Sequence, residues 1–450
     1  MSKQKSALMT EGKIWKSILF FSIPLILGNL LQQMYNTVDS IIVGNYIGND
    51  ALAAVSSSTS LINLLIAFGQ GAAVGAGVIV SQFLGAEKRD NVQSAIHTAL
   101  ALAIVLGLIL TAIGVVFTPF FLKYMKTPPE VLEQSILYLR IYSCGFLFNI
   151  IYNMTAGILN AVGNSKRSLF YLAIASFTNI ILDFILIRLC HMGVEGAAIA
   201  TDVSQALSGL LAILFLRKVP TAYQLHLKKI RFHKDMLLRI IKIGLPSGIQ
   251  NMVISFSNVL VQSSVNTFGT KAMAGFGAYL KIDGFNILPV LSFSMAVTTF
   301  TGQNFGAGKL DRVKKGMYVT TLMSFLYTAI TGSLIFLFAQ PMITLFTQDK
   351  AAISYGVLAV SYFCPYYFLI GILYALAGTV RGVGKSVPPM VVLLLSFCVF
   401  RIFWITLVLP HFDTIRGIYL LYPVSWTIGV TMMTLYTWKG KWLHLSANIK

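Results

Sequence analysis

The sequence predicts an all-α membrane protein in which twelve transmembrane helices form two six-helix bundles, related by a pseudo-twofold axis along the membrane normal. The first reason is composition: 56% of the 450 residues are apolar and 11% are charged, whereas soluble domains contain about 25% charged residues. Apolar runs long enough to cross a hydrocarbon core of roughly 30 Å recur from Ile14 to Trp438. The second reason is that the chain matches itself when it is shifted by 221 positions.

This internal repeat covers nearly the whole chain. Six predicted spans fall in each copy, and an even number of spans returns the chain to the side on which it started, so both copies insert the same way up. Repeats of this kind in an apolar chain are typical of transporters. The matching positions include Gln82 and Gln303, Gly85 and Gly306, Ala86 and Ala307, Gly157 and Gly378, and Gly163 and Gly384.

The apolar runs also predict the domain organisation. We expect an N-lobe at residues 1–220, with helices 1–6, and a C-lobe at residues 221–450, with helices 7–12. A basic cytoplasmic linker at about 217–235 joins the two lobes. The predicted spans are 14–45, 51–80, 92–121, 131–162, 168–189, 194–216, 236–267, 272–301, 312–340, 351–381, 386–410 and 415–438.

Lysine and arginine residues predict the orientation in the membrane. Of the 34 such residues, 25 fall in segments on the side of the N-terminus, among them Lys3 and Lys5, and six fall on the opposite side, among them Lys126. Because cytoplasmic loops carry the excess of basic residues, we expect a multi-pass plasma-membrane protein with both termini in the cytoplasm. The formal charge of +19 therefore belongs to the loops and does not indicate nucleic-acid binding.

Several function classes lack their sequence signals. The chain has no P-loop, so ATP is not the expected energy source. It has no HExxH motif and no cluster of histidines, so we expect no enzyme. The four cysteines form no CxxC pair and lie near no histidine at metal-ligand spacing. We therefore expect no cofactor and no metal beyond a coupling ion, with membrane lipid and small organic molecules as partners of a monomeric protein.

Acidic residues inside the predicted spans point to a site. A charged side chain at the centre of a membrane helix costs about 2.5–3.5 kcal/mol on insertion scales and usually lines a cavity. Asp39 lies at the end of a polar stripe on the first predicted helix, whereas the second copy has Val261 at that position. The stripe is formed by Asn29, Gln32, Gln33, Asn36, Asp39 and Ser40, whose spacing places them on one helix face.

The fifth and sixth spans show the same asymmetry. Asn179 and Asp183 are one helical turn apart, and Thr201 and Asp202 follow on the next span. We interpret the simultaneous loss of these polar groups from the second copy as one site confined to the first lobe, although interhelical hydrogen bonds that merely stabilise the bundle are an alternative. The second copy has Phe400, Trp404, Tyr422 and Pro423 at the four equivalent positions.

Two chemistries fit such a site. Two carboxylates close together in a medium of low dielectric constant cannot both ionise cheaply, so the pair can hold a proton. Two carboxylates, an amide oxygen, a hydroxyl and a backbone carbonyl can equally surround a small hard cation such as Na⁺. Pro24 precedes Asp39 on the same helix, where it either acts as a hinge that responds to the site or forms a static kink.

Other residues are candidates for a substrate cavity, because polar, aromatic and thioether side chains suit varied flat cations. For Lys281, Asp283 and Arg401, which lie inside the eighth and eleventh spans, the expectation is buried ion pairing, with a role in substrate binding second. The cavity candidates are Gln33, Tyr35, Asn36, Met154, Asn258, Asp283 and Met295.

The motifs Gln82-x-x-Gly85-Ala86 and Gln303-x-x-Gly306-Ala307, together with Pro24, Asp39 and Asn179-x-x-x-Asp183, resemble those of the multidrug and toxic compound extrusion (MATE) family, over essentially the whole chain. The resemblance implies efflux of organic, mostly cationic compounds in exchange for H⁺ or Na⁺. It further implies a bending role for Pro24, and no second cation site is expected because the seventh helix has no acid. The cation site that it implies consists of Asp39, Asn179, Asp183, Ala197 and Thr201.

Three alternatives compete with this antiporter. A flippase for lipid-linked saccharides is the main one, but it would need a more cationic cavity for a pyrophosphate group, and the first-lobe face carries acids. A membrane-embedded enzyme lacks a catalytic motif. The transporters with twelve helices and parallel halves known as MFS usually carry a basic signature between helices 2 and 3, and residues 84–89 do not match it.

Overall fold

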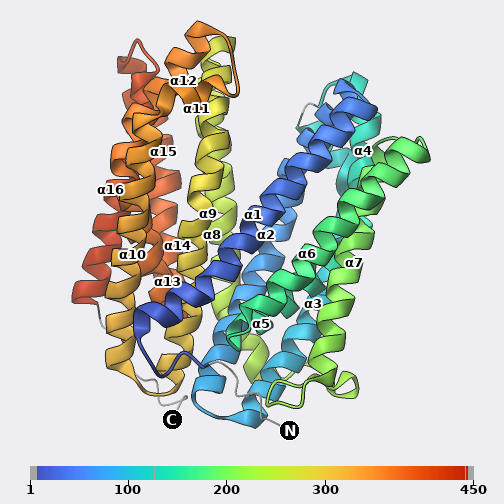
Figure 1. Cartoon of the computed structure of the whole chain (residues 1–450), viewed down its shortest axis with the longest axis vertical. Helices are drawn as coiled ribbons and strands as arrows, with labels where there is room; N and C mark the ends of the chain where they lie inside the picture. The colour runs from blue at the N-terminus through green and yellow to red at the C-terminus, as the bar shows by residue number, and fades with distance from the viewer. Residues whose placement is uncertain (1–7, 126, 441, 444–450) are drawn as a thin grey trace. The chain divides into compact units, whose positions relative to one another are not determined.

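The computed structural model describes residues 8–125, 127–440 and 442–443, and all of its regular secondary structure is helical (Figure 1). Five basic residues used for the orientation prediction lie outside these residues: Lys3, Lys5, Lys126, Lys441 and Lys450. The chain divides into two compact units. The first unit contains Pro24–Gly248, and the second contains Met9–Ile23 together with the described residues from Ile249 onward.

Two helices pass from one unit to the other. Helix α1 (Ile14–Tyr46) begins in the second unit and enters the first at Pro24, and helix α8 (Lys234–Asn266) begins in the first unit and enters the second just after Pro246. A proline inside a helix removes one backbone hydrogen bond and makes the helix easier to bend. Both crossing helices therefore have a weakened turn close to the place where they change unit.

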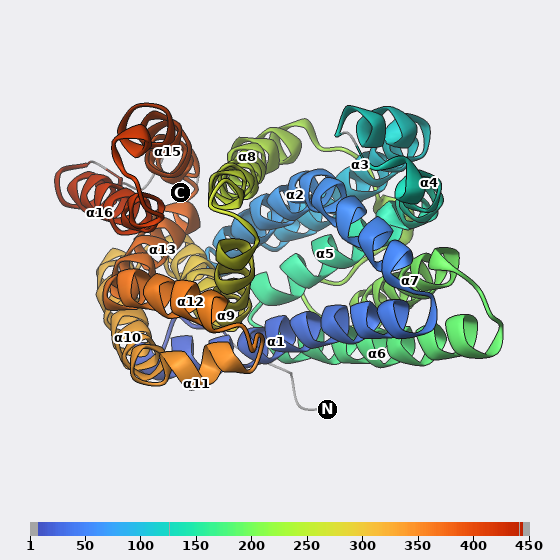
Figure 2. The same ribbon diagram turned by 90° about the horizontal axis from the view of Figure 1, so that it is seen from above.

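In the first unit, α2 is the central helix. It packs along α3, α4 and α5, and α7 packs against α4, α5 and α6; seen from above, α5 runs beside α2 (Figure 2). Besides most of α1, the helices of this unit are α2 (Asn49–Gly85), α3 (Arg89–Tyr124), α4 (Pro129–Cys144), α5 (Phe146–Ala161), α6 (Ser165–Asp183) and α7 (Val194–Lys218), with a π-helical segment at Phe184–Leu189.

The second unit repeats this packing. Helix α9 packs along α10, α12 and α13, and α13 packs against α16, as α2 does with α3, α4 and α5, and α5 with α7. The helices are α9 (Thr270–Gly306), α10 (Leu310–Leu337), α11 (Ala339–Thr344), α12 (Lys350–Phe363), α13 (Tyr367–Gly382), α14 (Val387–Leu393), α15 (Phe400–Phe403) and α16 (Arg416–Lys439), with π-helical segments at Leu394–Val399 and Trp404–Val408 and 3₁₀ turns at Cys364–Tyr366 and Leu409–His411.

The turns before α2 and α9 show the repeat in their backbone conformation as well. Gly48 has a φ of 127° and Gly269 has a φ of 92°, and the two positions coincide in the 221-residue shift. Backbone in this region favours glycine because other L-residues are strained there. The duplication predicted from side-chain identities is therefore also present in helix packing and turn geometry.

The number of spans agrees with the predicted twelve. Among the described residues, ten helices are long and apolar enough to cross a membrane, and α4 with α5, bent by 48°, form an eleventh. Helix α8 is the twelfth; its 33 residues are long enough, but they carry more polar side chains. The prediction of an all-α, twelve-helix membrane protein is confirmed.

Small residues allow α2 and α8 to pack closely within the first unit. A Cβ atom added at Gly71 would approach the carbonyl of Gly244 and the amide of Gly248, and one at Gly75 would lie 2.8 Å from the amide of Gly244. These glycines form a close packing surface, because any larger side chain would force the two backbones apart.

The chain before α1 is held at one end of the second unit. The amide of Met9 donates to Gln303 Oε1 at 2.8 Å, and Lys309 Nζ donates to the carbonyl of Thr10 at 3.0 Å. The guanidinium of Arg312 donates to the carbonyls of Met9, Glu11 and Gly12. Gln303 belongs to the repeated motif, so in the second unit this motif helps to hold the turn before α1 through its main chain.

Candidate functional site

The site is built on three helices of the first unit. Asp39 comes from α1, Asn179 and Asp183 come from the end of α6, and Thr201 comes from α7. The carboxyl groups of Asp39 and Asp183 lie next to each other. Asp183 is completely buried, Asn179 is 1% exposed and Asp39 is half-buried. Two acids from distant parts of the sequence therefore meet at a largely buried position.

The amide and hydroxyl of the site are linked in a chain. Asn179 Nδ2 donates to Thr201 Oγ1 at 3.3 Å, and Thr201 Oγ1 donates to the carbonyl oxygen of Ala197 at 3.0 Å. The side-chain amide of Asn179 therefore donates to the threonine, while its Oδ1 atom accepts no hydrogen bond from the described residues. The five residues implied by the resemblance thus fall into two linked groups: the acid pair, and the chain that starts on α6 one turn before Asp183.

The most informative feature of the site is a group of side-chain oxygen atoms that accept no hydrogen bond from the residues described. Asp39 Oδ1, Asn179 Oδ1 and both carboxyl oxygens of Asp183 are buried and have no hydrogen-bond donor among the described residues. Buried acceptors without a donor are costly. Their number and chemistry fit a proton shared between the two acids or a small hard cation, which prefers oxygen ligands.

The backbone around Asp183 is itself irregular. Helix α6 ends at Asp183, and the chain continues as a π-helical segment from Phe184 to Leu189. π-Helical turns are rare and often occur at functional sites, because they change the direction in which neighbouring side chains project. The sequence pattern placed Asn179 and Asp183 on one face but gave no sign of this change of helix type.

The structure adds residues that sequence analysis missed. The hydroxyl of Tyr35 lies beside the side chains of Gln32 and Gln205, and Gln205 Oε1 is buried without a donor. Tyr138 on α4 is 4% exposed and close enough to Asp39 and Asp183 to feel their charge. Gln205 could have been found, because it lies one helical turn after Thr201; nothing in the sequence connects α4 with the acids.

Asp202 does not join the acid pair. Its carboxyl group lies against the backbone of Gly145, at the bend between α4 and α5. The position needs glycine because a Cβ atom there would overlap the carboxyl group. The interpretation that included Asp202 in the same site is wrong, since its neighbour Thr201 points along a different side of α7.

The cavity candidates are spread over both units. In the first unit, Gln33 and Tyr35 are half-buried and Asn36 is exposed, whereas Met154 is completely buried in the apolar core. In the second unit, Asn258 and Met295 are exposed. The structure therefore groups only Tyr35 with the acid pair, and Met154 is inaccessible to any bound molecule.

Three charged residues of the second unit that were expected to pair, Lys281, Asp283 and Arg401, do not form ion pairs with one another. The guanidinium of Arg401, 2% exposed, donates to the hydroxyls of Ser257 and Ser425. It also lies over two aromatic rings, 4.6 Å from the centroid of Tyr422 and 4.8 Å from that of Phe397.

Asp283 and Lys281 also lie beside uncharged groups. Asp283 lies beside the hydroxyls of Tyr279 and Tyr367, and the ammonium of Lys281 is 5.5 Å from the ring centroid of Phe346. The expectation of a buried ion pair is therefore wrong. Hydroxyl groups and aromatic faces stabilise these charges instead, and such partners leave no signal at fixed sequence spacing.

Comparisons with known proteins agree with this architecture. Residues 24–185 and 246–406 match the family model described as MatE. "Probable multidrug resistance protein YoeA" of Bacillus subtilis (strain 168) is 28% identical, and the match covers 98% of each chain. "Probable multidrug resistance protein NorM" of Thermotoga maritima is 25% identical, with 96% of this chain and 93% of that protein covered.

Solved structures share the fold. A MOP superfamily transporter from Pyrococcus furiosus superposes with a TM-score of 0.91 at 23% identity, over 98% of each chain. A MATE protein in a bent conformation superposes with a TM-score of 0.89 at 22% identity, over 98% of this chain and 97% of that one. The two separate family matches, one in each half, coincide with the internal repeat.

Proposed function

The chain belongs to the MatE family, and from that premise we propose that it is a secondary multidrug efflux antiporter, which exports organic compounds in exchange for H⁺ or Na⁺. The transported compounds are organic and mostly cationic. The protein acts as a monomer in the plasma membrane, with both termini in the cytoplasm. The relatives named as probable multidrug resistance proteins support a role in resistance to organic compounds.

One observation carries the proposal: two acids and an amide present buried acceptor oxygens that no donor among the described residues satisfies. Acceptor oxygens of this kind destabilise the protein while they have no partner, and a small cation that binds between them lowers the free energy. The second unit cannot offer the same chemistry, because Phe400 and Trp404 replace the amide and the acid of α6 there. Coupling is therefore assigned to the first unit alone.

Coupling requires that the cation and the exported compound prefer different states of the protein. A ligand that binds two states equally shifts nothing, however tightly it binds. We infer that a cation at Asp39 and Asp183 favours the state that releases the organic compound. Binding of ethidium, a flat organic cation, to the purified protein should therefore weaken when the coupling ion is supplied.

The test uses purified protein in sealed lipid vesicles that contain ethidium. A pH gradient and a Na⁺ gradient are imposed in separate experiments, and loss of ethidium is followed by fluorescence. We expect one of the two gradients to drive efflux, and that gradient identifies the coupling ion. Efflux driven by neither gradient, with the protein correctly folded, would contradict the proposal.

Substitution separates the site from the rest of the molecule. Asp39→Asn and Asp183→Asn each remove a negative charge with little change of shape, so we expect gradient-driven efflux to fall to the background of empty vesicles. Asp235→Asn is the matched control, because Asp235 is exposed in the first turn of α8, and it should retain efflux. Normal efflux by a well-folded Asp39→Asn protein would remove the site from the mechanism.

A further inference from the structure

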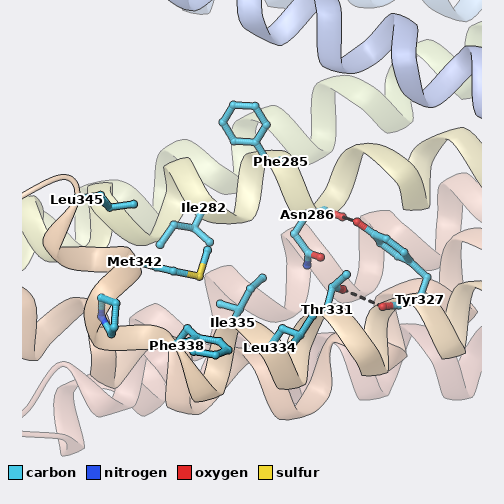
Figure 3. A pocket seen from close by; sticks show the side chains of 11 residues that line it. Ile282, Phe285, Asn286, Tyr327, Thr331, Leu334, Ile335, Phe338, Met342 and Leu345 are labelled. Atoms are coloured by element: carbon cyan, nitrogen blue, oxygen red, sulfur yellow. Dashed lines mark hydrogen bonds between the residues drawn. The ribbon is translucent and has the colours of Figure 1, made fainter.

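A cavity lies in the second unit, whereas the acid pair belongs to the first unit. It has a volume of about 680 Å³ and is formed between α9, α10 and α11 (Figure 3). Sites for drug-sized molecules usually measure about 300–1,000 Å³. Its polar lining comes from Asn286, Tyr327 and Thr331, and its other lining residues are apolar.

A helix break creates one wall of this cavity. Helix α10 ends at Leu337, and the short helix α11 carries Pro341 and Met342 into the lining. Proline at position 341 has no N–H to donate to the carbonyl four residues earlier, which favours a break there. In the first unit the equivalent helix, α3, continues to Tyr124 in spite of its own proline.

The comparison between the two copies shows that the polar lining is specific to this unit. The 221-residue shift places Leu65, Leu106 and Leu110 at the positions of the three polar residues. These leucines belong to the apolar core of the first unit or pack against it. One copy therefore fills the space with apolar side chains, and the other keeps it open and lines it with hydrogen-bonding groups.

Within this lining, the side-chain oxygen of Asn286 is a hydrogen-bond acceptor without a donor among the described residues. The residue is 7% exposed, and its Oδ1 atom is buried with no donor among the described residues. The neighbouring hydroxyls do not satisfy it: Tyr327 donates to the backbone carbonyl of Asn286 at 3.4 Å, and Thr331 donates to the carbonyl of Tyr327 at 2.9 Å. Figure 3 shows the amide directed between α9 and α10, toward Thr331.

Among the residues that the structure describes, those that line the cavity carry no charge. The two nearest in sequence are occupied elsewhere, since Lys281 lies over Phe346 and Asp283 lies beside two tyrosine hydroxyls. A charged molecule would lose its hydration here without a counterion. The cavity therefore suits an uncharged molecule with an apolar body and one group that can donate a hydrogen bond.

We propose that this cavity is a binding site for an uncharged, drug-sized organic compound, whose hydroxyl or N–H group donates to Asn286 Oδ1. The site is separate from the acid pair, and it lies entirely within the second unit. Its existence does not depend on the antiport mechanism, because it is detected by binding rather than by transport.

The experiment uses a photoreactive probe, a trifluoromethyl-diazirinyl phenol, which is uncharged and carries one hydroxyl. The full chain is reconstituted in phospholipid vesicles and illuminated, and labelled peptides are identified by mass spectrometry. We expect saturable labelling of α10 and α11 near Leu334 and Met342, and unlabelled naphthol should compete with it. The analogous probe without the hydroxyl should label this region more weakly and without saturation.

Two variants test the role of the amide and the cavity. Asn286→Leu inserts the residue type of the other copy and should lower the affinity for the phenol about fivefold, as expected for one lost hydrogen bond. Leu334→Trp should fill the space and abolish saturable labelling. Thr320→Val is the control: Thr320 is a buried residue of α10 that does not line the cavity, and labelling should remain unchanged.

Three outcomes would overturn the proposal. Equal labelling by the two probes that is insensitive to Asn286→Leu would identify a groove filled by lipid chains. Loss of saturable phenol labelling when phospholipid is added to detergent-solubilised protein would also assign the cavity to lipid. Labelling that stays in Leu334→Trp, with the variant eluting as a folded protein, would place the probe elsewhere.

Discussion

The residue type at some positions of this protein is determined by a side chain that is distant in sequence but adjacent in the fold. Gly145 has an ordinary helical φ of −81°, so its backbone would accept any residue. The carboxyl group of Asp202 nevertheless fills the place of a side chain at that position. Asp202, which looks like part of a coupling site in the sequence, therefore packs against the bend between α4 and α5.

Gly145→Ala should destabilise the protein by about 1–3 kcal/mol, the usual cost of overpacking. The measurement is the temperature at which half of the detergent-solubilised protein stops eluting as a single peak. Gly277→Ala is the control, because nothing lies within 4 Å of an added Cβ atom there. Adding Asp202→Ala to Gly145→Ala should restore part of the loss; no recovery would show that the carboxyl group is not the obstacle.

Among the helices, irregular turns occur close to the functional features. A π-helical segment follows Asp183, a broken helix opens the cavity beside Met342, and Pro24 lies where α1 passes from one unit to the other. A freed backbone group inside a membrane needs another partner. In α3, where Pro119 cannot donate to the carbonyl of Val115, Arg140 Nε donates to that carbonyl at 3.3 Å.

Pro24 is proposed as a hinge of α1. Pro24→Ala restores an N–H group and stiffens the helix by one backbone hydrogen bond, so we expect gradient-driven ethidium efflux to fall about tenfold while ethidium binding is kept. The equivalent change on α8, Pro246→Ala, provides the comparison. Full efflux in Pro24→Ala would mean that the kink is static and has no part in transport.

At the scale of the whole molecule, the chain exchanges segments between its two units. The segment from Met9 to Gly12, at the start of α1, is held by Arg312, Asn304 and Lys309 of the second unit. The rest of α1, from Pro24, belongs to the first unit. Each half of the duplicated chain is therefore completed by the beginning of the other half's first helix.

Arg312→Ala should release this segment. The guanidinium donates hydrogen bonds to three backbone carbonyls, so its loss should speed hydrogen exchange of the Met9 amide by about tenfold, measured by mass spectrometry on the reconstituted protein. Lys315→Ala, an exposed residue on the same helix, should leave exchange unchanged. Unchanged exchange in Arg312→Ala would show that the guanidinium is not needed to hold the segment.

The sequence by itself determined the apolar spans, the duplication and the one-sided distribution of acids. These properties are local or depend on matching positions along the chain, so helical periodicity and the repeat reveal them. Asn179 and Asp183 on one face of a helix follow from a spacing of four residues, and the amide, the acid and the packing glycines of α2 could all be found in this way.

Tertiary structure alone decided which of these groups meet. Asp39 reaches Asp183 while Asp202 turns to Gly145, and Arg401 lies among hydroxyls and aromatic rings instead of pairing with Asp283. Contacts between helices depend on how each helix is rotated and where it is broken, and the sequence of one helix carries no record of its neighbour. For the same reason, only the folded chain shows that Asn286, Tyr327 and Thr331 line an open space where the other copy packs leucines.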